Sequence, residues 1–138
     1  MRAAIPVAVF GLTLARYNPT LTPSLSYSSP DGNEPVTICY RLGLAHPSGY
    51  PLFTCLRSCF TFFPIGDVAH RINLMSAVLG AGSVVLLYAI ARLVEISRLL
   101  DAFSALFFAF SRTSWSHAVI AEVYAPNLLV VALALRLS

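Results

Sequence analysis

The chain has 138 residues, of which 57% are hydrophobic and only 11% are charged. An ordinary soluble domain carries about 25% charged residues, so this composition excludes a disordered chain and argues against a water-soluble monomer. The net charge of +3 comes from arginines that stand singly between apolar runs. Scattered arginines form no basic patch, which argues against a nucleic acid partner and is typical of membrane-boundary residues. We therefore expect a protein of the lipid bilayer.

The first apolar run covers residues 3–15 and follows Arg2. As a helix it would be about 20 Å long, shorter than the roughly 30 Å hydrocarbon core, so a signal-peptide core is an alternative. We favour a first transmembrane helix over residues 3–16, because the small-residue motif suited to signal cleavage, at 13–15, lies inside the apolar run.

Residues 17–71 are expected to form a long first loop. Proline, glycine, serine and threonine dominate residues 18–33, Pro35 suits the start of a short helix, and the string AHPSGYP at 45–51 excludes regular structure. Beyond this string, apolar side chains recur at the spacing of one helix face, namely at Leu52, Cys55, Leu56, Cys59, Phe60 and Phe63. The opposite face carries Thr54, Arg57, Ser58 and Thr61. This pattern predicts an amphipathic helix that is too short to span the bilayer and lies in its interface.

Three further transmembrane helices are expected, over residues 72–94, 99–113 and 124–138. The first contains 20 consecutive uncharged residues, at 72–91, and its small residues Ser76, Gly80 and Ser83 share one face that another helix can approach closely. We expect the second to bend near residues 112–115. The third stops before it could cross, so residues 1–138 are expected to form one incomplete membrane domain.

Acidic residues are few, so each is a candidate for function. Asp31 and Glu34 stand three residues apart in the first loop, where a carboxylate could deprotonate a hydroxyl or hold a divalent cation. The same pair fits a turn followed by a helix cap. Glu122 lies between two apolar stretches, either as a functional group at membrane depth or as a boundary residue. Cys55 and Cys59 share a helix face, but no His or further Cys stands at metal spacing. The three histidines are too dispersed to predict a metal site.

Three strings carry a resemblance to a known family: LGLAHPSGYPLF at 42–53, RINLMS at 71–76 and AEVYAPN at 121–127. On these strings the chain resembles the polytopic transmembrane protein 260 family and its bacterial relatives, which are grouped with the C-type glycosyltransferases. The family carries Asp-Ser-Gly-Glu upstream of its His-Pro motif, and Asp31 and Glu34 match the two acids. The residues between them differ, Pro35 replaces an aliphatic residue, and Ser48 replaces a frequent proline.

The resemblance implies an all-α polytopic membrane protein, the N-terminal part of a glycosyltransferase helix bundle with interfacial helices in the first loop. That loop would be lumenal or periplasmic, although the arginine distribution leans weakly towards a cytoplasmic loop. The membrane would be the endoplasmic reticulum in a eukaryote or the inner membrane in a bacterium. The donor would be a polyprenyl-phosphate sugar, and in the eukaryotic member mannose passes to serine or threonine of an acceptor protein.

The resemblance also implies roles for individual residues. Asp31 would be the catalytic base, with Glu34 beside it. An arginine among Arg41, Arg57 and Arg71 could stabilise the departing lipid phosphate. The residues expected to bind substrate are His46, Pro47, Tyr50, Arg71, Glu122, Tyr124 and Asn127. No cofactor is firmly implied, and the need for a divalent metal stays open.

The composition is also compatible with two other functions. The chain could be an inactive membrane module, or a small transporter or channel subunit with Glu122 in the pathway. The specific string at 46–51 argues against the transporter. We therefore expect the N-terminal fragment of a membrane glycosyltransferase.

Overall fold

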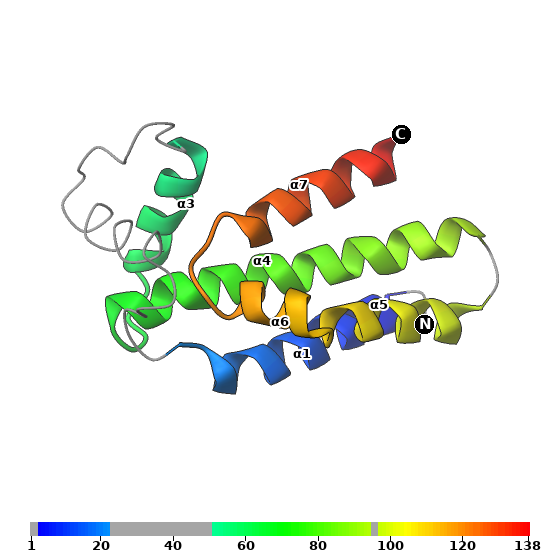
Figure 1. Cartoon of the computed structure of the whole chain (residues 1–138), viewed down its shortest axis with the longest axis horizontal. Helices are drawn as coiled ribbons and strands as arrows, with labels where there is room; N and C mark the ends of the chain where they lie inside the picture. Colours follow the sequence, from blue (N-terminus) through cyan, green and yellow to red (C-terminus); the bar gives the residue numbers. More distant parts are fainter. Residues whose placement is uncertain (1–2, 23–50, 95–96) are drawn as a thin grey trace.

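A computed structural model describes residues 3–22, 51–94 and 97–138, and the regular structure within these ranges is entirely helical (Figure 1). The α-helices and 3-10 helices in chain order are α1 (Ala4–Tyr17), η1 (Asn18–Thr20), α3 (Pro51–Thr61), α4 (Val68–Ala91), η2 (Arg92–Val94), α5 (Arg98–Ala109), α6 (Arg112–Ala118) and α7 (Tyr124–Leu137). The expected all-α class is confirmed for these residues.

Helix α4 is the centre of the fold, and the other α-helices pack against it. Helices α1, α5 and α6 lie on one side of it, whereas α3 and α7 lie on the other (Figure 1). Together with η2 it forms a 27-residue apolar stretch, Val68–Val94, which within the described ranges is the one helix long and apolar enough to cross a membrane. Asp67 caps its start by accepting a hydrogen bond from the backbone N–H of His70 at 2.7 Å.

The other expected crossings correspond to shorter helices. Helices α1, α5 and α7 contain 14, 12 and 14 residues, so each is about 18–21 Å long. This is less than the roughly 30 Å of the hydrocarbon core. For the residues that it describes, the structure supports one membrane-spanning helix, and the additional crossings stay predictions.

The small residues of α4 form a close helix contact, as expected. Ser76 and Ser83 are fully buried. A Cβ atom at Gly80 would lie only 3.1 Å from Cβ of Ala118 and 3.6 Å from the ring of Tyr17. The absence of a side chain at Gly80 therefore lets α6 and the end of α1 approach α4.

The end of α1 is fixed by aromatic side chains. Tyr17 is fully buried, and its hydroxyl donates a hydrogen bond to the carbonyl of Ala109 at 2.8 Å. Its ring meets the ring of Trp115 edge-on at 5.6 Å, and the indole N–H of Trp115 donates to Oγ1 of Thr20 at 3.0 Å. These contacts join the end of α1 to the junction of α5 and α6.

The helix expected over residues 99–113 differs in the structure. Instead of bending near residues 112–115, it ends at Ala109, and α6 begins at Arg112. Ser111 causes the break, because its extended backbone and its hydroxyl, which accepts a bond from the Ser114 N–H at 3.4 Å, start a new helix.

Helix α3 turns its mixed face inward. Phe53 and Arg57 are 8% and 2% exposed, whereas Leu52 is 79% exposed. Cys55 and Cys59 on the outer side are also exposed. Most of the apolar stripe that the sequence predicts is therefore directed away from the bundle, where an interfacial helix would contact lipid, while Leu56 and Phe60 are half-buried.

Candidate functional site at the α6–α7 connection

The connection between α6 and α7, residues 119–123, carries the string that sequence reasoning singled out. Its turn is closed by the Glu122 N–H, which donates to the Ile120 carbonyl at 2.9 Å. Helix α7 then begins at Tyr124, as expected, and Pro126 falls within its first turn. Proline is tolerated there because the first N–H groups of a helix have no partner inside the helix.

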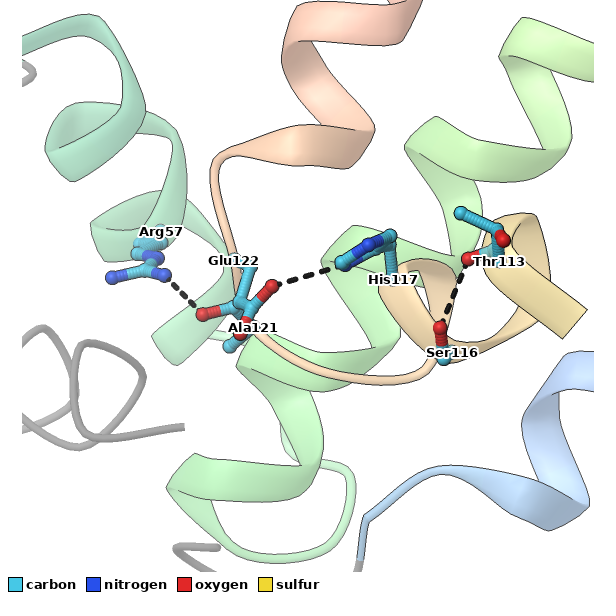
Figure 2. Close-up of polar contacts among 6 residues, drawn as sticks. All are labelled: Arg57, Thr113, Ser116, His117, Ala121 and Glu122. Carbon is cyan, nitrogen blue, oxygen red and sulfur yellow. Dashed lines mark hydrogen bonds and ion pairs between the residues drawn. The ribbon is translucent and has the colours of Figure 1, made fainter. Parts of the chain in front are cut away.

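Three side chains of this region form a cluster, His117, Glu122 and Tyr124. Nδ1 of His117 lies 3.2 Å from Oε2 of Glu122, and the two side chains are 42% and 19% exposed (Figure 2). The Tyr124 ring packs against the His117 imidazole with a centroid separation of 4.4 Å. A carboxylate, an imidazole and an aromatic face are thus presented together, within reach of a ligand.

Arg57 of α3 is buried and bonds to the backbone next to Glu122 of this cluster. Its guanidinium donates a hydrogen bond to the Ala121 carbonyl at 2.6 Å (Figure 2), and it lies 3.8 Å from the centre of the Phe53 ring. A buried cation requires such partners, and hydrogen bonds from a charged donor are among the strongest in proteins. The bond ties α3 to the residue that precedes Glu122.

Arg71, a predicted substrate-binding residue, lies in the first turn of α4, and its side chain reaches back to the turn between α3 and α4. Its guanidinium donates to the carbonyls of Thr61 at 2.7 Å, Ile65 at 3.0 Å and Gly66 at 2.9 Å. Gly66 has a φ of 58°, a conformation that glycine adopts without strain. The structure therefore gives Arg71 a role in holding this turn, and its contact with substrate stays a prediction.

Asn127 lies close to the cluster along α7. Its backbone N–H donates to the Val123 carbonyl at 3.1 Å, and its side chain is exposed. Residues three apart share a helix face, so Asn127 and Tyr124 lie on the same exposed side of α7. The structure thus brings together three of the predicted residues, at 122, 124 and 127.

The other predicted residues lie outside the described ranges, namely Asp31, Glu34, His46, Pro47 and Tyr50. Within the ranges that are described, no three His, Cys, Asp or Glu side chains gather as metal ligands. A divalent cation at the two acids of the first loop stays a prediction.

The described stretches on both sides of residues 23–50 are bonded to the α6–α7 connection. Before them, Thr22 donates its backbone N–H to the Val119 carbonyl at 3.2 Å. After them, α3 donates through Arg57 to the Ala121 carbonyl. The described chain is therefore bonded to this connection at Thr22, just before residues 23–50, and at Arg57, six residues after the chain resumes at Pro51.

His117 and Arg57 are the residues whose roles sequence reasoning missed. His117 is separated from Glu122 by five residues, a spacing that no regular helix face brings together. The sequence offers no local signal for the turn that joins them, because residues 118–123 contain no Gly, Pro, Asn, Asp or Ser. Arg57 offered a weak signal, as a lone cation four residues after an aromatic ring.

Comparisons with known proteins identify the family. Residues 31–138 match the family model described as the protein O-mannosyl-transferase TMEM260 N-terminal domain. The chain is 40% identical over 133 residues to mouse (Mus musculus) "Protein O-mannosyl-transferase TMEM260", covering 96% of this chain and 19% of the relative. It is 32% identical over 120 residues to the Dictyostelium discoideum protein of that name, covering 85% of this chain and 14% of the relative.

No solved structure matches the chain. The chain spans less than a fifth of the length of these two relatives. The resemblance seen in the three sequence strings is confirmed by the family match, which includes all of them. The chain therefore belongs to the family of TMEM260 N-terminal domains.

Proposed function

We propose that this chain supplies the N-terminal part of a membrane enzyme that transfers mannose from a polyprenyl-phosphate donor to serine or threonine of a protein. The observation that carries the proposal is the family match over residues 31–138, because the family description and both relatives' names specify protein O-mannosyl transfer. The long apolar helix Val68–Val94 supports a membrane location. In a eukaryote this would be the endoplasmic reticulum, with the first loop on the lumenal side.

The proposed reaction is a substitution at the anomeric carbon of the sugar. The acceptor hydroxyl oxygen forms a bond to C1, the bond from C1 to the phosphate oxygen breaks, and the lipid phosphate leaves with the electron pair. The hydroxyl proton passes to the carboxylate of Asp31, because an unassisted alcohol is a weak nucleophile. Glu34 stands three residues further along the chain and would help to orient the acceptor.

The geometry around the first loop supports placing its acids in one site with the α6–α7 connection. On either side of the two acids, Thr22 and Arg57 bond to the carbonyls of Val119 and Ala121. Described parts of the chain before and after the two acids are thereby bonded to the connection that carries Glu122. We expect the loop and the cluster at the connection to line one substrate site.

Arg71 could still assist the departing phosphate. A guanidinium has five N–H donors, and three of those on Arg71 bond to carbonyls of the α3–α4 turn. The remaining two, one on each terminal nitrogen, could bind a phosphate oxygen. This proposal gives Arg71 both a structural and an electrostatic role.

The test uses a chimera in which residues 1–138 replace the matching segment of the mouse relative. Membranes containing the chimera are supplied with radiolabelled dolichyl-phosphate mannose and a serine/threonine acceptor peptide. We expect labelled mannose on the peptide, and none when GDP-mannose replaces the lipid donor in membranes depleted of dolichyl phosphate.

Two results would contradict the proposal. A well-expressed, membrane-inserted chimera that transfers no mannose would refute the assigned activity. Equal transfer from GDP-mannose under these conditions would refute the lipid-linked donor. The isolated 138-residue chain, assayed beside the chimera, tests whether these residues transfer mannose without the rest of the relative.

A further inference from the structure

We infer that Glu122, held in place by His117 and Arg57, binds hydroxyl groups of the donor's sugar ring. This inference rests on the proposed function and assigns part of its substrate site. It adds His117 as a direct partner of the binding carboxylate and Arg57 as a positioning residue that does not touch substrate.

The carboxylate of Glu122 has one oxygen committed and one available. Oε2 lies 3.2 Å from Nδ1 of His117. Oε1 makes no hydrogen bond to any part of the chain that the structure describes, and the side chain is 19% exposed. An ionised carboxylate only accepts hydrogen bonds, so Oε1 suits a ligand that donates, such as a sugar hydroxyl. The negative charge disfavours the lipid phosphate at this position.

Tyr124 adds an apolar surface beside the carboxylate. Tyr124 is 54% exposed, and its ring packs on the imidazole of His117 at 4.4 Å. Aromatic side chains combine an apolar face with a polar edge. A hexose has the matching character, since its C–H groups form apolar patches and its hydroxyls project around the ring. The cluster therefore fits the sugar of the donor better than it fits the lipid chain.

Arg57 acts on this cluster through the backbone. Its 2.6 Å bond to the Ala121 carbonyl fixes the residue before Glu122. Arg57 is 2% exposed, so it is screened from substrate. When Arg57 is removed, the Glu122 carboxylate is still present, but we expect it to be less well oriented. Sugar binding should therefore be weakened and not abolished.

The test measures donor and acceptor KM separately in the active chimera. Glu122→Gln keeps the size of the side chain but loses its charge, and the expected result is a donor KM raised about tenfold or more, with the acceptor-peptide KM unchanged. Arg57→Met retains the packing on Phe53 but removes the donor to Ala121, and we expect a smaller rise of the donor KM. Arg57→Lys, which can still donate one hydrogen bond, should restore part of the affinity.

Tyr17→Phe is the matched control, because it removes another buried hydrogen bond between a side chain and a carbonyl, to Ala109. We expect it to lower stability while both KM values stay at the wild-type level. A rise in the acceptor KM instead of the donor KM, or unchanged KM values in Glu122→Gln, would overturn the inference while transfer itself continues. Absence of transfer in the unmutated chimera would refute the proposed function and this inference with it.

Discussion

The contact at Gly80 offers a sharp test of how α4 organises the fold. A Cβ atom there would be 3.1 Å from Cβ of Ala118, closer than side chains normally pack. At Gly11 in α1, a Cβ atom would meet nothing within 4 Å among the described residues. The same substitution to leucine at both sites therefore separates helix propensity from packing.

Helix propensity and packing change the free energy of unfolding in opposite directions. Leucine is a better helix former than glycine by about 0.7 kcal/mol, so Gly11→Leu should slightly increase the free energy of unfolding. At Gly80 the added atoms force α6 away from α4, and overpacking of this kind costs about 1–3 kcal/mol. We expect Gly80→Leu to be less stable than Gly11→Leu by about that amount.

The assay is thermal unfolding of the purified chain in detergent micelles, followed by the fluorescence of Trp115. This indole belongs to α6 and packs on Tyr17, so it reports on the perturbed contact. For a chain of this size each kcal/mol shifts Tm by about 2–4 °C. Equal Tm values for the two variants, or a higher Tm for Gly80→Leu, would refute the close contact of α4 and α6.

Two further substitutions test the buried polar contacts. Tyr17→Phe leaves the Ala109 carbonyl without its 2.8 Å partner, and we expect a loss of about 1–2 kcal/mol in the free energy of unfolding, measured by chemical denaturation. Arg92→Met removes the 2.7 Å ion pair with Asp101, whose side chain is only 7% exposed. We expect a loss of about 1–3 kcal/mol by the same assay, because the carboxylate stays buried without this cation.

Each of these two substitutions has a result that would contradict the assigned contact. The double variant Arg92→Met/Asp101→Asn no longer contains the buried, uncompensated charge of the Asp101 carboxylate. It should therefore recover part of the stability that Arg92→Met loses. A double variant less stable than Arg92→Met would contradict the ion-pair assignment. A Tyr17→Phe protein with wild-type stability would show that the hydroxyl of Tyr17 is not bonded to Ala109 in solution.

The central helix and the start of α7 could be predicted from the sequence because their signals are local. The uncharged run at 72–91 and the small residues Ser76, Gly80 and Ser83 are sufficient to locate a helix and its contact face. The start of α7 follows from the apolar run after residue 123. These features depend on residues within a few turns of each other.

The orientation of α3 could not be predicted in this way. Its apolar stripe and its mixed face are both visible in the sequence, yet the buried face contains Arg57. The reason is a partner 64 residues away, the carbonyl of Ala121. A periodic pattern identifies two faces, but only the tertiary partner determines which face is buried.

The candidate site was partly predicted for a similar reason. Glu122 stood out because an acid between apolar stretches is rare. His117 did not, since the pair depends on α6 ending at Ala118 and on the turn that follows it. The break before α6 was encoded locally by Ser111, a residue type favoured at helix starts, but the surrounding phenylalanine-rich run obscured it.

Comparing two acids in the active chimera tests the central claim of O-mannosyl transfer most directly. Asp31→Asn removes the proposed base, whereas Asp67→Asn changes an acid that caps α4 and retains an oxygen able to accept the same hydrogen bond. With dolichyl-phosphate mannose and an acceptor peptide, we expect Asp31→Asn to reduce the rate of mannose transfer at least a hundredfold. Asp67→Asn should transfer at the wild-type rate. Wild-type transfer by an equally expressed Asp31→Asn enzyme would contradict the account.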